Sequence, residues 1–160
     1  MRKAILSFAL LLALSGCTPA PEAATADCDG VLVEVNFGTL NAERINACIG
    51  FDGDEILAKD ALSQAGVEIE GTLTYPDQIV CRVNGLPSET EAIEIEGQEP
   101  HLETCADMPP AFAYWALWVK NGDAAQWEYA TEGAATLKLI KGQSVGLAFA
   151  SGDLAPTPSE

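Results

Sequence analysis

Basic residues are scarce in this chain of 160 residues, which carries 8 lysines and arginines against 24 aspartates and glutamates, for a formal net charge of −16. A surface this negative repels phosphate backbones, so nucleic acid is a poor partner. The excess of acid predicts a domain that its charge keeps soluble, with attraction of calcium or a cationic ligand as the alternative.

Groups for catalysis are also few. His101 is the only histidine, and no Gly-x-Ser-x-Gly motif, phosphate loop or dinucleotide fingerprint accompanies it. Its acidic neighbours favour a surface histidine over a general base. Glu94 and Glu96 lie two apart in an alternating stretch, which places both on one solvated face. The sequence therefore disfavours an enzyme, and no catalytic residue or cofactor is expected.

Metal-binding patterns are equally weak. No CxxC spacing is present, which disfavours zinc. The turn at residues 52–55 (DGDE) offers carboxylates to calcium, but Ile56 and Leu57 stand where a calcium loop needs oxygen ligands and glycine. An aspartate that caps a following helix is the favoured interpretation of this turn. No metal site is expected.

The chain also lacks an apolar run of the ~20 residues that cross a bilayer as a permanent helix. The run from Ala4 to Leu14 is short, and it lies between basic residues and Ser15-Gly16-Cys17. These features predict a signal peptide at residues 1–16 and resemble the bacterial lipobox, which implies acylation of Cys17. A protein anchored in a membrane of the cell envelope and facing outward is then expected. Thr18 after the cysteine favours the outer membrane of a Gram-negative host; the alternative is an ordinary cleavage near Ala24 without lipid.

Composition divides the mature chain. Residues 17–27 are rich in proline and alanine and predict a lipidated flexible tether, while residues 152–160 predict a disordered tail. Residues 28–151 remain for a single domain, which is enough for one hydrophobic core.

Four cysteines remain once Cys17 is set aside, and an even number in an oxidising compartment predicts two disulfides. Four cysteines allow three pairings. We favour Cys28–Cys48 with Cys81–Cys105, because each closes a modest loop between neighbouring segments, and each should contribute roughly 3 kcal/mol to stability.

Hydrophobic periodicity predicts a mostly β domain with one helix. Apolar residues spaced as on a helix span Glu55 to Ala65, and Gly66 is a natural stop. Alternating stretches predict six or more strands, and the fold class is α+β. The expected strands lie at 31–37, 44–49, 67–73, 78–84, 92–96, 112–120, 126–131 and, as short pieces, between 137 and 150.

The stretches IVCRVNGLP and AYWALWVKNG, with a cysteine between them, resemble the β-grasp domain similar to the C-terminal domain of transcobalamin and intrinsic factor. The resemblance extends from Val31 to about Ala150. It implies a β-grasp-like, mostly antiparallel sheet with one helix packed across it. In the vitamin carriers this domain closes over one face of cobalamin, so the resemblance implies a corrinoid or a similar large planar small molecule as ligand. This chain offers no counterpart of the carriers' helical domain, so half of such a site is expected.

Large aromatic residues gather in two adjoining predicted strands. Alternation places Tyr114 and Trp118 on one face and Trp115 on the other. We expect these three at or near any ligand surface, and the alternative is that all belong to the core. Two functions follow: a small-molecule binding lipoprotein, or a protein-interaction subunit of an envelope complex with no small ligand of its own.

Overall fold

The computed structural model describes residues 28–123, 125–153 and 155–159. The predicted signal peptide at 1–16, the predicted lipidation site Cys17 and the predicted tether at 17–27 lie outside the described residues. Within the described ranges, no helix has the length and apolar character that crossing a membrane requires.

Nine strands, one α-helix and one short 3-10 helix make up the described chain. In order they are β1 (Val31–Asn36), η1 (Gly38–Leu40), β2 (Ile45–Ile49), β3 (Ile56–Leu57), α1 (Ala58–Gln64), β4 (Ile69–Gly71), β5 (Val80–Val83), β6 (Ala113–Asn121), β7 (Glu128–Tyr129), β8 (Lys138–Leu139) and β9 (Gln143–Ser151).

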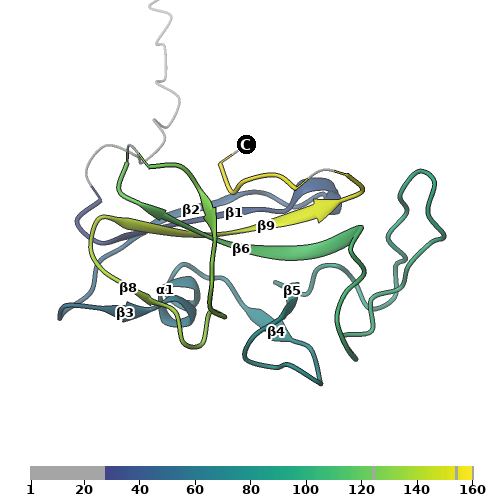
Figure 1. Ribbon diagram of the computed structural model, residues 1–160, viewed down its shortest axis with the longest axis horizontal. Helices are drawn as coiled ribbons and strands as arrows, with labels where there is room; N and C mark the ends of the chain where they lie inside the picture. The colour runs from purple at the N-terminus through teal and green to yellow at the C-terminus, as the bar shows by residue number, and fades with distance from the viewer. Residues whose placement is uncertain (1–27, 124, 154, 160) are drawn as a thin grey trace, which may run out of the picture.

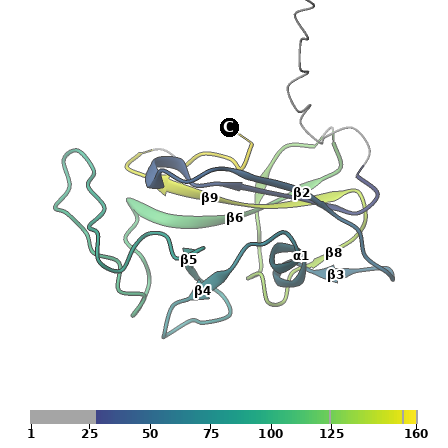
Figure 2. The ribbon, with the colours of Figure 1, turned by 180° about the vertical axis from the view of Figure 1, so that it is seen from behind.

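The main sheet has five strands in the order β2-β1-β9-β6-β7. β1 and β9 run parallel at its centre, and the other neighbours are antiparallel. The small pairs β3–β8 and β4–β5 lie with α1 on one side of this sheet, as both ribbon views show (Figures 1 and 2). The α+β class and the mostly antiparallel pairing predicted from the sequence are confirmed.

The core lies between α1 and the sheet. Every second residue of the central strands points toward α1, whose Ala58, Ala61 and Leu62 are buried against them. The strand residues in this core include Val31, Val33, Val35, Ala113, Trp115, Val145, Leu147 and Phe149. Burial of such side chains stabilises a fold by about 1.5–3 kcal/mol each. We call this side of the sheet its inner face.

The helix is shorter than the predicted 55–65. Ile56 and Leu57 form β3, which pairs with β8, so α1 begins only at Ala58. Leu57 is the N-cap residue and makes no side-chain capping bond, so the cap predicted from the turn at 52–55 is wrong. The predicted stop at Gly66 is confirmed, since Gly66 has a φ of +77° and directly follows the C-cap residue.

Two further strands differ from prediction. The stretch at 92–96 contributes only an isolated bridge between Ile93 and His101, and the stretch at 126–131 shortens to the two residues of β7.

Both disulfides are confirmed with the favoured pairing. Cys28 is bonded to Cys48 and Cys81 to Cys105, with Cα–Cα distances of 5.5 and 5.6 Å.

Candidate functional site

The face of the sheet opposite α1, here called the outer face, carries a single row of residues across all five strands. Register pairs Asn46 with Glu34, Glu34 with Gly146, Gly146 with Trp118, and Trp118 with Tyr129. Residues directly opposite one another in a sheet share a face. Polar side chains therefore lie on one flank of Gly146 and aromatic side chains on the other.

Small residues occupy the outer positions of the central strand β9. They are Ser144, Gly146, Ala148 and Ala150, and all are buried. Because the flanking strands carry larger side chains, these four residues form the floor of a channel, which we call the outer groove. A hollow of about 490 Å³ continues it at one end, lined in part by Asn36, Gly38 and Ser151.

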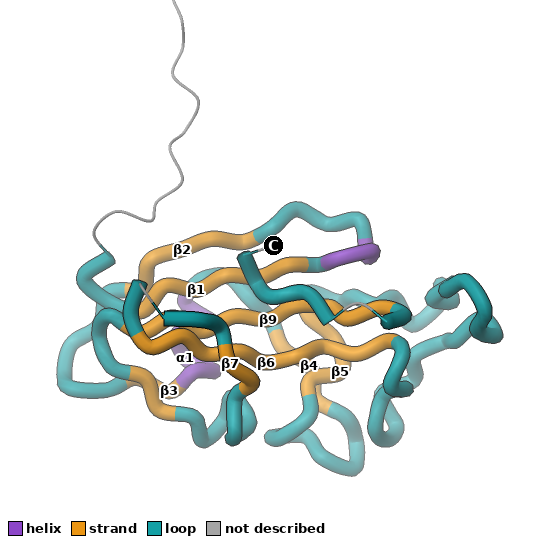
Figure 3. The backbone as a smooth tube through the Cα atoms, turned by 45° about the horizontal axis from the view of Figure 1, so that its top comes forward, coloured by secondary structure: helices purple, strands orange, loops and turns teal. Residues whose placement is uncertain are grey.

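The outer groove is occupied by the chain's own C-terminal segment, residues 155–159 (APTPS). The segment folds back over the main sheet on the face away from α1 (Figure 3). Pro158 is buried on Gly146: a Cβ at Gly146 would lie 2.5 Å from Pro158 Cγ. Only glycine leaves this room. These residues belong to the stretch 152–160, for which the sequence predicts a disordered tail.

Side chains of the domain hold this segment by its backbone. Asn36 Nδ2 donates to the Thr157 carbonyl at 3.2 Å, and the Arg44 guanidinium donates to the carbonyls of Pro158 at 3.3 Å and Ser159 at 3.5 Å. Bonds to carbonyls demand no particular side chain from the occupant. One side-chain bond is added, from Trp127 Nε1 to Ser159 Oγ at 2.8 Å.

Two buried polar atoms beside Gly146 have no hydrogen-bond partner among the described residues. They are Glu34 Oε2 and Trp118 Nε1, and each residue is only 7% exposed. The other Glu34 oxygen accepts from Asn46 Nδ2 at 3.2 Å. A buried acceptor or donor without a partner costs about 1–3 kcal/mol, so both atoms favour an occupant that would satisfy them.

Aromatic side chains form the second flank. Trp118 stacks on Tyr129 with ring centroids 3.9 Å apart, and the Lys120 ammonium lies 5.2 Å from the centre of the Trp127 ring. A side-chain hydrogen bond in which the neutral Tyr129 hydroxyl donates to Tyr114 is the main cause that raises the pKa of Tyr129 above its usual 10.0, with burial as a smaller cause.

A cavity of about 530 Å³ lies where β6 extends beyond the short strand β7, and Tyr114, Trp115 and Tyr129 contribute to its lining. Ala130 N donates to Leu117 O, so Leu117 turns its backbone groups toward β7. By the alternation of an antiparallel strand, the backbone of Trp115 faces the same side, where β7 has already ended. The cavity thus borders an open stretch of sheet edge.

The three aromatic residues singled out from the sequence are divided by the sheet. Tyr114 and Trp118 lie on the outer face, whereas Trp115 is buried in the inner core at 6% exposure. Its ring packs edge-on against Phe37 and Phe149, and its Nε1 donates to the Leu86 carbonyl at 3.0 Å. A structural role accounts for these contacts of Trp115.

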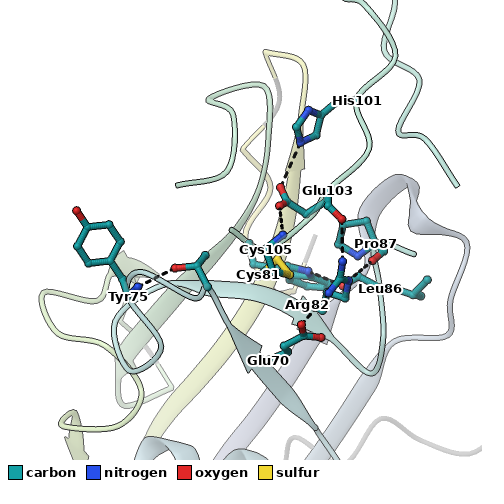
Figure 4. Close-up of a disulfide and its surroundings, with 11 residues drawn as sticks. Glu70, Tyr75, Cys81, Arg82, Leu86, Pro87, His101, Glu103 and Cys105 are labelled. Atoms are coloured by element: carbon teal, nitrogen blue, oxygen red, sulfur yellow. Dashed lines mark hydrogen bonds and ion pairs between the residues drawn. A yellow bond between two sulfur atoms is a disulfide. The ribbon is translucent and has the colours of Figure 1, made fainter. Parts of the chain in front are cut away.

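The second disulfide lies beside a network of ion pairs formed by the buried side chains of Arg82 and Glu103 with two more exposed partners (Figure 4). Arg82 pairs with Glu70 at 2.7 Å and also donates to the carbonyls of Pro87 and Glu103. His101, which is partly exposed, lies 3.3 Å from a Glu103 oxygen. Cys81, Glu103 and Cys105 lie close enough to share a metal ion, but both sulfurs are bonded to each other and offer no thiolate.

Sequence reasoning missed the polar flank, the glycine floor and the C-terminal segment that together make the outer groove. Glu34 and Asn36 stand at alternate places in a strand that is otherwise apolar, and small residues alternate along β9. These two patterns could have indicated the polar flank and the small-residue floor of the outer groove. The Pro-x-Pro spacing of the C-terminal segment was a third.

No family model, curated protein or solved structure matches the chain. The resemblance to the transcobalamin-like domain therefore stays an expectation.

Proposed function

We propose that this chain is a non-catalytic binding module of the cell envelope, and that its outer groove takes an extended, proline-containing peptide from a partner protein. The observation that supports this proposal is the placement of residues 157–159, which lie in the groove as such a peptide would. It corresponds to the protein-interaction function expected as one of two possibilities from the sequence.

The chemistry of the groove suits proline in particular. Proline lacks an amide hydrogen, so burying its nitrogen on the small residues of β9 leaves no donor unsatisfied. A Pro-x-Pro segment is also already extended before it binds, which lowers the entropy cost of binding. Recognition of proline-rich segments by aromatic-lined grooves follows the same physical logic.

A partner peptide can make interactions that the C-terminal segment leaves unmade. A donor placed against Glu34 Oε2 and an acceptor placed against Trp118 Nε1 would satisfy both buried atoms. Such a peptide would displace the chain's own segment, which then acts as a protective cover for the groove rather than as its final occupant.

Peptide titration tests this proposal. Pro156→Ala with Pro158→Ala weakens the hold of the groove on the C-terminal segment. The full mature chain with both substitutions is titrated with the peptide APTPSE by calorimetry. We expect saturable binding, and about tenfold weaker binding of the control peptide AATASE. Trp127→Phe should weaken APTPSE binding, whereas Tyr75→Phe, an exposed residue outside the groove, should not. Equal affinity for both peptides would defeat the proposal.

We further propose that the module is anchored by lipid on Cys17, after removal of residues 1–16. The basic start, the short apolar run and Ser15-Gly16-Cys17 support this location. Mass spectrometry of the protein purified from its host membrane tests it: acyl mass on a chain that begins at Cys17 is expected, and a chain beginning near Thr25 without lipid would overturn it.

A second candidate is capture of a flat small molecule, such as a corrinoid, at the cavity beside Tyr114 and Tyr129. Its volume of about 530 Å³ supports this candidate, because small-molecule sites commonly hold about 300–1,000 Å³. The β-grasp assignment, on which the corrinoid expectation rests, is supported by the central parallel pair of first and last strands and by the helix across one face. Titration with cobalamin while tryptophan fluorescence is followed tests it; no quenching beyond absorption at micromolar ligand would defeat it.

A further inference from the structure

We infer that the outer groove also accepts the chain's own N-terminal tether, with Pro19 and Pro21 in the places that Pro156 and Pro158 occupy in this structure. This inference rests on the proposed function of the groove and names one of its ligands. The tether and the C-terminal segment would then compete for a single site.

The two ends of the chain carry the same spacing. Residues 18–22 are Thr-Pro-Ala-Pro-Glu, and residues 155–159 are Ala-Pro-Thr-Pro-Ser. When the prolines are aligned, Pro21 replaces Pro158 on Gly146 and Ala20 replaces Thr157, whose carbonyl is the group that Asn36 binds. Both replacements keep every backbone carbonyl that the groove recognises.

The alignment places an acidic residue where the groove is basic. Glu22 takes the place of Ser159, which lies at the Arg44 guanidinium and accepts a hydrogen bond from Trp127 Nε1. Lys120 lies over the same Trp127 ring. Since the chain has only 8 lysines and arginines, two cations at one place are notable. A carboxylate there gains charge-assisted hydrogen bonds that a serine hydroxyl lacks.

Chain polarity is compatible with this exchange. The C-terminal segment runs from Asn36, which binds Thr157, toward Trp127, which binds Ser159. Along β1 this is the direction from Asn36 back toward Leu32. Leu32 lies opposite Cys48 of β2. The tether precedes Cys28, which is bonded to Cys48, so a tether that lay in the groove would run toward Leu32 in the same direction.

The tether is also long enough. The seven Cα-to-Cα steps from Pro21 to Cys28 span up to about 23 Å when extended. Two strand spacings and one two-residue repeat separate Cys48 from Gly146, which is about 12 Å. The Cα atoms of Cys28 and Cys48 are 5.5 Å apart, so the groove lies within reach in the same molecule.

Fluorine NMR of the full mature chain labelled with 5-fluorotryptophan tests this inference, because Trp127 reports on the occupant and Trp115, in the inner core, serves as an internal control. Pro156→Ala with Pro158→Ala should move the Trp127 resonance as the C-terminal segment yields its place. Adding Pro19→Ala and Pro21→Ala should move it again, to the position of an empty groove, independently of protein concentration. Glu22→Gln should weaken tether binding about threefold.

The outcomes separate the two claims. If the C-terminal substitutions move the Trp127 resonance but the tether substitutions leave it there, the inference about the tether is overturned and the peptide groove stands. If the C-terminal substitutions themselves have no effect, the groove does not hold the segment and the proposed function fails as well. If the second change of the Trp127 resonance disappears on dilution, the tether binds another copy of the chain, and binding within one molecule is overturned.

Discussion

The two faces of the main sheet are both buried, but by different means. The inner face carries large apolar side chains, such as Leu147 and Phe149, that pack against α1. The outer face carries glycine, alanine and serine on β9 and is covered in part by a segment held through a few hydrogen bonds. The inner face therefore supplies most of the stability. The outer face has the smaller contact, and exchange of its cover is what the proposed binding function requires.

The largest expected effect comes from the inner face. Leu147→Ala removes a fully buried side chain of β9 and should lower the free energy of unfolding by about 2–5 kcal/mol. Ala148→Gly, the next residue, which faces outward, should cost about 0.5–1 kcal/mol. Urea denaturation measures both, and equal losses would show that the two faces do not differ as described.

Filling the floor of the outer groove should have an intermediate effect. A Cβ at Gly146 would lie 2.5 Å from Pro158 Cγ and 2.7 Å from the Glu34 carbonyl oxygen, so Gly146→Ala should cost about 1–3 kcal/mol in urea denaturation. Gly50→Ala, where no atom lies within 4 Å, is the matched control and should be nearly neutral. A neutral Gly146→Ala would contradict the close packing of the groove.

Glu34→Gln tests the unpaired oxygen of the polar flank. An amide costs less to bury than a carboxylate, so this change should raise the free energy of unfolding at neutral pH by about 1 kcal/mol. Glu96→Gln, at an exposed position, should change it by less than about 0.5 kcal/mol. Destabilisation by Glu34→Gln would mean that the negative charge of Glu34 stabilises the fold.

The smallest effect concerns the aromatic flank. Because the pKa of Tyr129 is raised in the folded state, the stability from its neutral form is present below pH 10.0 and is lost as pH rises through the raised pKa. Tyr114→Phe should lower the pKa of Tyr129 toward 10.0, as measured by tyrosinate absorbance. Tyr75→Phe should leave it unchanged, and an unshifted Tyr129 in Tyr114→Phe would contradict the pairing.

Local patterns were sufficient for much of the fold. Alternation located β1, β2, β5, β6 and β9, and cysteine spacing led to both disulfides, because these features depend on neighbours along the chain. The start of α1 was misjudged because Ile56 and Leu57 pair with β8, a strand far along the chain. That pairing outweighs the helical preference of the segment.

Sequence patterns could predict only part of the candidate site. The sequence placed Tyr114 and Trp118 on one face, but which face α1 covers is a tertiary fact, and it removed Trp115 from the outer face. Nothing local could have brought Glu34, Gly146 and Trp118 into one row, because they belong to three strands whose order is set by long-range pairing.

By itself, the sequence determined the α+β class and the faces of individual strands, since these follow from periodicity, and it favoured one of the three possible cysteine pairings. Only the tertiary structure decided which face α1 leaves uncovered, and that residues 155–159 lie on that face. The reason is physical: a short Pro-x-Pro segment has no packing preference of its own, and its place exists only once Gly146 lies between the polar strands and the aromatic strands.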